Sequence, residues 1–340
     1  MSESDKCYLE AWPKNTNEVA KLVKFAYTNN IPIRAQGNSH SENGSSLPKK
    51  FELLIHTTFL NAMKFDNKNI ITVGSGIPIS LVNQKLEELS DFKLPVYNGG
   101  GLGPSVGGYI SAGGLSFQSE VYGGFWEQVE EITLVTGFGR IVQVKRNSPL
   151  FIWLFGSMGQ LGIITQAKLK IMASSSKKKI TFPQGLHLNI SPIQQQTNHS
   201  SLYWFNLFVK DHELDTAIRD LEILQKKHHQ VLQYHTMYHW KIAYLHENPP
   251  LVFPSSESFH MIGIWGTQKE PNQKSIIHLA QDFSDLVLQK QYKRYIQAEY
   301  LPDNPQQYYR KYFGEKNYLQ FKAIKKSLDP QFSFNRGSVF

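Results

Sequence analysis

The spacing of apolar residues in the first half of the chain predicts alternating helices and strands. Residues 15–29 gather their apolar side chains on one helical face and begin with a capping box made by Asn15 and Glu18. Further helices are predicted at 81–89 and 150–155, strands at 31–36, 51–56, 70–73 and 161–171, and a hairpin at 129–144.

The second half has a different pattern, which predicts a small sheet covered by two helices. Apolar and aromatic runs predict strands at 202–209, 231–239 and 259–266, and helical periodicity predicts amphipathic helices at 214–225 and 276–288. Because strands alternate with helices and at least one hairpin is present, we expect an α+β fold and not a purely parallel sheet.

Chain length and the placement of glycine divide the sequence into two regions. A length of 340 residues fits two domains at about 150 residues each. Glycines are frequent before residue 174 and scarce after it, so close approach of the backbone to a ligand is expected in the first region. The stretch 174–179 is a candidate linker. We therefore predict a ligand-holding domain at 1–174 and a second domain from residue 175.

Composition and charge narrow the class of protein. The formal net charge is +8, but the lysine runs are short and no nucleic-acid-binding motif accompanies them, so no nucleic-acid partner is expected. No apolar run reaches the ~18 residues of a membrane span, and the N-terminus lacks the order of a signal peptide. The single cysteine, Cys7, cannot form an intramolecular disulfide. These features predict a cytoplasmic protein that does not bind membranes.

The loop at 35–44 has the composition of an anion-binding nest. It follows a strand and contains two glycines and several small hydroxyl residues, with His40 in its middle. Consecutive backbone N–H groups in such a loop suit a pyrophosphate. The alternative is a polar surface turn in which the histidine is incidental.

A Rossmann fingerprint at Gly74-Ser75-Gly76 is excluded, because position 79 is Ile where a third glycine is needed.

His235 and His239 have the spacing of a helical metal-binding pair. They lie in a predicted strand, where residues four apart do not converge on one ion, and no third ligand is close in sequence. We therefore expect no metal.

Several segments, in order along the chain, resemble the vanillyl-alcohol-oxidase-type (PCMH-type) FAD-binding domain. The matching segments are Asn15–Val19, Ile31–Arg34, Gly37–Gly44, Val106–Gly108, Val135–Gly137 and Gly159–Thr165, with Asp329–Pro330 and Asn335–Gly337 near the end. Within that family the chain is most similar to the cytokinin dehydrogenases. The resemblance implies a two-lobed FAD-binding domain, a small α+β substrate cap at 175–298, and a C-terminal segment at 299–340 that returns to the FAD domain.

The resemblance also implies which residues hold the cofactor. His40 takes the place of the histidine that is joined covalently to the 8α carbon of the flavin, and residues 37–41 would hold the pyrophosphate. A second, cysteinyl bond is excluded because Cys7 lies upstream of the domain. The implied FAD contacts are Ala35, Gly37, Asn38, Ser39, His40, Ser41, Ser45, Gly100, Ser105, Gly107, Gly108, Ser111, Leu115, Ile164, Tyr300, Asn335 and Ser338.

Two departures from the family pattern concern catalysis. Cytokinin dehydrogenases carry an aspartate base just before the Val-Gly-Gly element, and the matching position here is Gly100. Tyr97 and Asn98 are the nearest polar candidates for a catalytic role, although neither is a carboxylate base. The segment that precedes the strand at 202–209 is also much shorter than in the relatives, which implies a truncated cap.

The resulting prediction is an FAD-dependent oxidoreductase that transfers a hydride from a small organic substrate to flavin N5. Candidate substrate contacts are Trp204, Asn206 and Leu301, with core packing as the alternative for Trp204 and Leu301. The expected electron acceptor is O2 or a quinone-like molecule. Two other functions stay open: a sugar or aldonolactone oxidase, and an FAD-binding protein that has lost catalysis.

By resemblance to aldonolactone enzymes, the missing Cβ of Gly114 is a candidate space through which O2 reaches the flavin. The alternative is that this glycine serves backbone packing.

Overall fold

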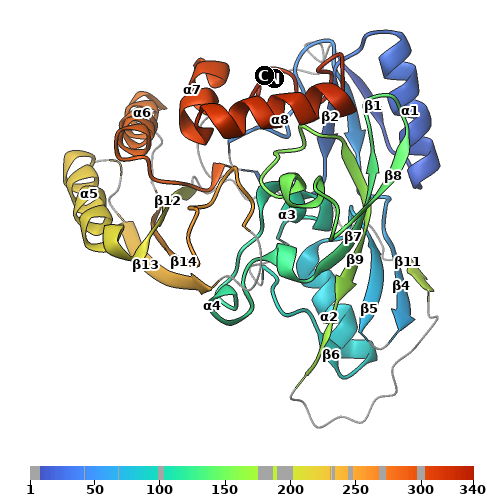
Figure 1. The fold of residues 1–340 in the computed structure, drawn as a ribbon, viewed down its shortest axis with the longest axis horizontal. Helices are drawn as coiled ribbons and strands as arrows, with labels where there is room; N and C mark the ends of the chain where they lie inside the picture. The colour runs from blue at the N-terminus through green and yellow to red at the C-terminus, as the bar shows by residue number, and fades with distance from the viewer. Residues whose placement is uncertain are drawn as a thin grey trace.

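The computed structural model describes residues 8–41, 43–67, 69–98, 103–174, 187–189, 202–229, 231, 234–243, 248–267, 273–296 and 303–340. The architecture is mixed α+β with several sheets, which confirms the predicted fold class at that level (Figure 1). Among the helices of these residues, none has the length and apolar character needed to cross a membrane.

The N-terminal elements form a three-stranded parallel sheet with a helix against it. The strands lie in the order β1-β3-β2, with bounds β1 (Leu9–Ala11), β2 (Ile33–Gln36) and β3 (Leu53–His56). Helix α1 (Thr16–Thr28) has the predicted capping box, since Asn15 Oδ1 accepts from the Glu18 N–H at 3.0 Å. Its buried face packs with β2 and β3 in one hydrophobic cluster, which fixes the position of the loop that follows β2.

A six-stranded antiparallel sheet is the largest sheet of the described residues. Its spatial order is β11 (His187–Asn189), β4 (Ala62–Asn67), β5 (Ile70–Gly74), β9 (Ile163–Lys170), β7 (Val129–Val135) and β8 (Ile141–Lys145). The hairpin β7–β8 confirms a prediction, whereas β4 was missed because it offers only two strongly apolar residues. Strand β11 comes after the predicted boundary at residue 174 and still pairs with β4. The domain boundaries stay predictions.

Helices and short turns connect these strands. They are α2 (Ile79–Leu89), α3 (Val106–Ala112), α4 (Ser119–Tyr122), η2 (Phe125–Glu127) and η3 (Phe151–Leu154), together with the strand pair β6 (Phe92–Lys93) and β10 (Met172–Ala173). The helix predicted at 150–155 is only a 3₁₀ turn. Helix α3 was not predicted, because Gly107 and Gly108 oppose helix formation. It forms here with Ser105 as its N-cap.

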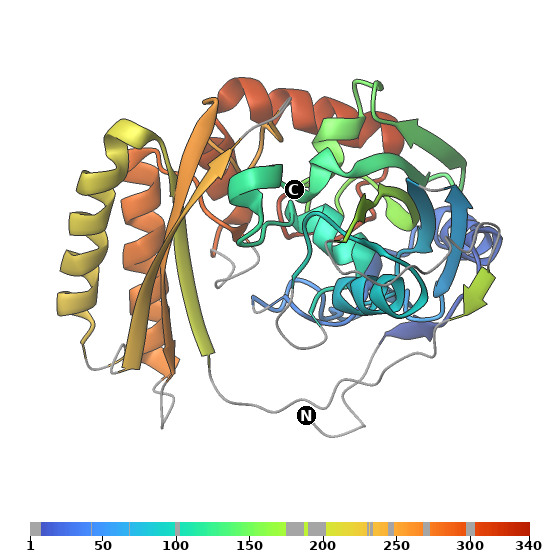
Figure 2. The same ribbon diagram turned by 90° about the horizontal axis from the view of Figure 1, so that it is seen from below.

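The second region forms a three-stranded antiparallel sheet with two helices on its outer face, as predicted (Figure 2). The elements are β12 (Leu202–Val209), η4 (Asp211–Glu213), α5 (Leu214–Lys227), β13 (Tyr234–Ala243), β14 (Ser258–Thr267) and α6 (Gln273–Lys290). Alternation along β12 separates two faces. Phe205 packs on Phe283 of α6 with ring centroids 5.1 Å apart, and Phe208 packs on Phe253 at 5.0 Å on the opposite face. The second face is turned toward the first region.

The C-terminal helices α7 (Pro305–Phe313) and α8 (Glu315–Leu328) bring the end of the chain back to the N-terminal sheet. Phe334 forms a parallel bridge with Ile33 of β2. Ile33 N–H donates to Ser333 O at 2.9 Å, and Asn335 N–H donates to Ile33 O at 2.9 Å. The last residues therefore lie beside the start of the loop that follows β2.

Candidate functional site

A cavity of about 430 Å³ lies between the glycine-rich first region and the inner face of the sheet β12–β14–β13. Its walls come mainly from the loop at 35–46, helix α3 with its flanks, the loop at 158–164 and the second sheet. Thr57, Ser75, Tyr97, Asn98, Tyr295 and Asn335 complete them. The size is typical of small-molecule sites, which often lie between domains.

The backbone of the loop after β2 has the features of an anion-binding nest. Ser39 has φ +52°, a left-handed conformation that is uncommon outside glycine. Within the described part of the chain, the amides of residues 37–40 donate no hydrogen bond to another residue. All four residues line the cavity. Their N–H groups are therefore available to an anionic group of a ligand.

Side-chain hydrogen bonds hold this loop in place. Ser41 Oγ lies 2.7 Å from both Asn43 Oδ1 and Ser45 Oγ. The buried guanidinium of Arg34 binds Glu52 in bidentate fashion, at 2.7 and 2.9 Å, and also donates to the carbonyl of Ser45. A buried bidentate pair of this kind fixes geometry as well as charge, so these contacts hold the loop in one conformation.

Gly37 lets the loop approach helix α3 more closely than any side chain would allow. A Cβ at Gly37 would lie 2.2 Å from Ser105 Oγ and 2.9 Å from Ser105 Cβ. Ser105 Oγ in turn accepts from Gly108 N–H at 3.2 Å and caps α3. The two ligand-facing segments are thus in direct backbone-to-side-chain contact.

The first backbone amides of α3 already donate hydrogen bonds within the protein, in contrast to the amides of residues 37–40. Val106 N–H donates to Ile77 O at 2.8 Å, and Gly107 N–H donates to Ser75 O at 2.9 Å. Ser75 Oγ lines the cavity, is fully buried, and has no hydrogen-bond partner among the described residues. A buried hydroxyl is costly unless a partner satisfies it, so the cavity fits a ligand that carries polar groups at this depth.

The imidazole of His40 lines the cavity and is exposed, with protein on part of its surface. Desolvation by its surroundings lowers the pKa of His40 below the usual value. The side chain is therefore neutral at pH 7, with a ring nitrogen lone pair available as a nucleophile.

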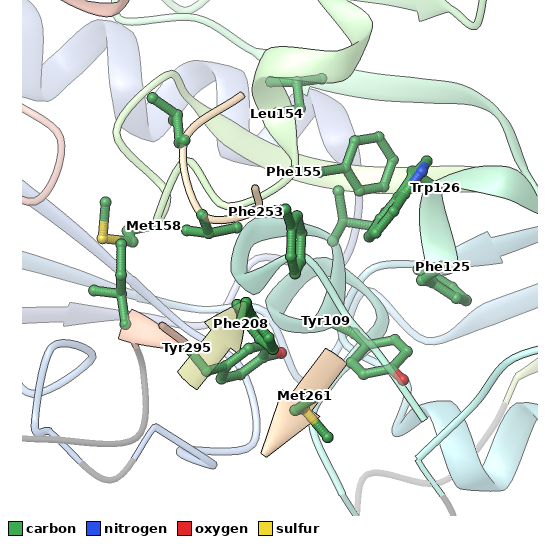
Figure 3. Packing of buried hydrophobic residues seen from close by; sticks show 14 of the residues in the cluster. Tyr109, Phe125, Trp126, Leu154, Phe155, Met158, Phe208, Phe253, Met261 and Tyr295 are labelled. Atoms are coloured by element: carbon green, nitrogen blue, oxygen red, sulfur yellow. The ribbon is translucent and has the colours of Figure 1, made fainter. Parts of the chain in front are cut away.

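Aromatic side chains form the wall opposite the loop. Tyr109, Met261 and Tyr295 come together there from three distant parts of the chain (Figure 3). Trp204 lies 5.4 Å from Tyr295 between ring centroids, and Trp240 lines the same wall. Burial raises the pKa of Tyr109 and of Tyr295, so both phenols stay neutral. This wall suits a planar or apolar molecule.

Tyr97 and Asn98, the candidate catalytic residues, both line the cavity. Burial, assisted by the charge of Glu87, raises the pKa of Tyr97. Tyr97 is therefore a hydrogen-bond donor at neutral pH and not a base. Among the described lining residues no side chain is Asp, Glu, Lys or Arg.

The structure brings most of the predicted cofactor contacts together around this cavity. Trp204, predicted to touch substrate, also lines it, whereas Gly100, Tyr300 and Leu301 lie outside the described residues. The predicted cofactor contacts that line it are Ala35, Gly37, Asn38, Ser39, His40, Ser41, Ser45, Ser105, Gly107, Gly108, Ser111, Leu115, Ile164 and Asn335. Their individual roles stay predictions.

Two predicted contact residues lie behind the cavity wall instead of on it. Asn206 is buried, and its Oδ1 accepts from Tyr295 N–H at 2.9 Å, so it positions a lining residue. Ser338 is also buried, and its hydroxyl lies 3.4 Å from the guanidinium of Arg34. In both cases the sequence identifies the right region of the chain but not the residue that lines the cavity.

Other lining residues were missed by the sequence analysis. Strand alternation could have found Trp240 and Met261, because their register places both on the face of Phe208. No local signal marks Tyr295, which arrives from outside any regular element. The missed residues with polar, aromatic or sulfur-containing side chains include Ser46, Thr57, Ser75, Tyr109, Ser116, Phe117, Met158, Trp240, Met261 and Tyr295.

Gly114 does not border an opening. A Cβ there would lie 2.5 Å from three ring atoms of Tyr109, and Tyr109 Oη donates to Leu115 O at 2.6 Å. The expectation of free space for O2 at Gly114 is therefore wrong, and the alternative of close packing holds.

Of the two histidines noted in the sequence, only His239 has a described side chain. His239 Nε2 lies 2.7 Å from His260 Nδ1 of the neighbouring strand. Within the described chain no group of three or more histidine, cysteine, aspartate or glutamate side chains is arranged to hold a metal ion.

Comparison with known proteins identifies the first region. Residues 9–145 match the family model of an FAD binding domain, FAD_binding_4. Cytokinin dehydrogenase 3 of Arabidopsis thaliana is 28% identical over 177 residues, covering 49% of this chain and 33% of the relative. The mitochondrial D-lactate dehydrogenase (cytochrome) 1 of Saccharomyces cerevisiae is 31% identical over 174 residues, covering 47% and 29%.

A third relative is an uncharacterized oxidoreductase, ORF5 in the fasciation locus of Rhodococcoides fascians. It is 27% identical over 164 residues, covering 48% of this chain and 37% of the relative. The matches thus span about a third of each relative's length.

Proposed function

We propose that this chain, which contains a PCMH-type FAD-binding domain and is related to flavin-linked dehydrogenases, is an FAD-dependent oxidoreductase of a small organic substrate. The observation that carries the proposal is the cavity in which a loop with unoccupied amides faces an aromatic wall. When bound, FAD supplies the hydride-accepting ring.

The residues present fit this cofactor. The amides of residues 37–40 are free to receive the pyrophosphate, and Ser75 Oγ is a buried hydroxyl in need of a partner. Gly37, Gly107 and Gly108 let the segments that line the cavity pack closely, since a Cβ at each would meet Ser75 or Ser105 within 3.2 Å. Pre-organisation of this kind reduces the entropy that binding must overcome.

We propose further that FAD is attached covalently through His40. In this linkage a ring nitrogen of His40 would be bonded to the flavin 8α carbon in place of the imidazole N–H and one C–H of the 8α methyl group. An oxidant such as O2 would take up the two electrons and two protons. The lowered pKa of His40 supports this role, because only the neutral imidazole is nucleophilic.

The unit of β12–β14 with α5 and α6 is the proposed substrate cap, shortened relative to the family. Its inner face contributes Trp204, Trp240 and Met261, which offer stacking and apolar contact. No described lining side chain carries a formal charge at pH 7 that would pair with a carboxylate substrate such as D-lactate. We therefore expect a neutral substrate, with O2 or a quinone-like molecule as electron acceptor.

The test is anaerobic reduction of the purified yellow protein, followed by absorbance at the flavin bands. Neutral amines, alcohols, sugars and aldonolactones are compared with D-lactate. Bleaching by a neutral compound supports the proposal, and faster bleaching by D-lactate contradicts the substrate class. Isopentenyl adenine should react about 10²–10⁴-fold more slowly than with an enzyme that has a positioned base.

A second candidate function is FAD binding without catalysis. It is favoured by the absence of a carboxylate among the described lining residues and by the raised pKa of Tyr97. A protein that stays yellow with every substrate, yet is reduced by dithionite, would support this function instead.

A further inference from the structure

Three segments of the chain meet behind the cavity at one buried lysine. Lys325, on α8, is 1% exposed at its side chain. Its Nζ lies 2.7 Å from Gln160 O, 2.9 Å from Phe334 O and 2.7 Å from Asp329 Oδ2. These three acceptors match the three donors of an ammonium group. Lys325 thus joins α8, the loop after η3 and the C-terminal tail.

The two segments that Lys325 joins to α8 form one wall of the cavity. Met158, Gly159 and Asn335 all line it. Asn335 Nδ2 donates to Met158 O at 2.7 Å, and Gln160 Nε2 donates to Asn335 O at 3.1 Å. The fit is close, because a Cβ at Gly159 would lie 2.6 Å from Asn335 Nδ2.

Burying the charged ammonium group of Lys325 costs free energy, because the group loses its hydration. Burial lowers the pKa of Lys325 to about 8, although Asp329 beside it opposes that shift. Asp329 carries its own contacts to the tail, from Ser333 Oγ at 2.7 Å and Phe334 N–H at 2.9 Å. Apolar residues of similar volume are often as stable as a buried pair, so stability alone does not explain this arrangement.

We propose that Lys325 is a positioning residue for the cofactor: it fixes the loop at 157–161 against the tail at 333–335, so that Gly159 and Asn335 hold their places in the FAD-binding wall. The inference rests on the proposed binding of FAD in this cavity. Lys325 itself does not line the cavity, and it acts through the two backbone carbonyls that it binds.

The experiment uses protein purified with FAD in a His40→Ala background, where no covalent bond can form. Lys325→Met is compared with Lys326→Met, which makes the same substitution at an exposed position of the same helix. A double variant, Lys325→Met/Asp329→Asn, removes the unpaired carboxylate that could unfold the single variant. For each protein, circular dichroism verifies folding. The rate of FAD release on dilution is followed by flavin fluorescence, and the rise in Tm on adding FAD is measured.

We expect FAD release to be about tenfold faster in both Lys325 variants, as when a residue behind a ligand contact is removed. Their FAD-induced rise in Tm should shrink, and Lys326→Met should match the background. The double variant should have a higher Tm than Lys325→Met but release FAD as fast. If Lys325 served only the stability of the fold, recovery of Tm would restore FAD retention as well. Folded Lys325 variants that release FAD at the control rate would overturn the inference. If the wild type binds no FAD, the proposed function fails, and the inference fails with it. If only the background protein fails to bind FAD, the inference is overturned, because the wall that Lys325 positions would not hold FAD without the covalent bond.

Discussion

Replacement of Gly37 by alanine tests how closely the loop at 35–46 must approach α3. The new Cβ would lie 2.2 Å from Ser105 Oγ and 2.9 Å from Ser105 Cβ, well inside van der Waals contact. The φ of Gly37 is outside the left-handed region, so backbone strain does not contribute. The cost therefore comes from this collision and from the helix cap that Ser105 provides through Gly108 N–H.

The magnitude follows from those two effects. Overpacking of a close contact costs about 1–3 kcal/mol, and loss of an N-cap hydrogen bond about 1 kcal/mol. Gly37→Ala should therefore lower the free energy of unfolding by about 2–4 kcal/mol. Ser105→Gly removes the colliding atoms, and glycine is tolerated at an N-cap with a loss of only a few tenths of a kcal/mol.

A double-mutant cycle separates the collision from other effects. Urea unfolding at pH 7, followed by circular dichroism, gives the free energy for the wild type, Gly37→Ala, Ser105→Gly and the pair. We expect the pair to be more stable than Gly37→Ala, with a coupling energy above about 1 kcal/mol. Additive losses, with a coupling near zero, would refute the account of this contact.

Four further results are expected. Acid precipitation of the wild type should leave the yellow colour in the pellet, whereas His40→Ala should release it to the supernatant; colour released from the wild type contradicts covalent attachment. Because the pKa of His40 is lowered from about 6.5, its neutral form dominates at pH 7. The rate at which added FAD becomes covalently attached should be flat above pH 7 and fall only in acid, and a rise between pH 7 and 9 argues against this. Gly114→Ala should destabilise by about 1–3 kcal/mol through Tyr109, seen as a lower Tm. Trp204→Ala should raise KM more than it lowers kcat, and an unchanged KM removes Trp204 from the substrate wall.

The loop at 35–44 could be predicted from the sequence as a candidate anion-binding nest because its determinants are local. A strand, two glycines, small hydroxyl residues and His40 lie within a few residues, and a nest depends on backbone conformation over that distance. Helix α1 could be predicted for the same reason, since its capping box and apolar face are formed by residues close together in the chain. Such features need no knowledge of the rest of the fold.

The far wall of the cavity and the support behind it were decided only by tertiary structure. Tyr295 reaches the site because Asn206, 89 residues earlier, accepts a hydrogen bond from its amide. Gly114 looked like open space in the sequence, but folding places the ring of Tyr109 against it. No feature of the sequence distinguishes Lys325 from the other lysines, whereas in the structure two carbonyl oxygens and one carboxylate oxygen accept hydrogen bonds from its Nζ. Contacts over such separations depend on how the elements pack, and no local pattern of residues encodes them.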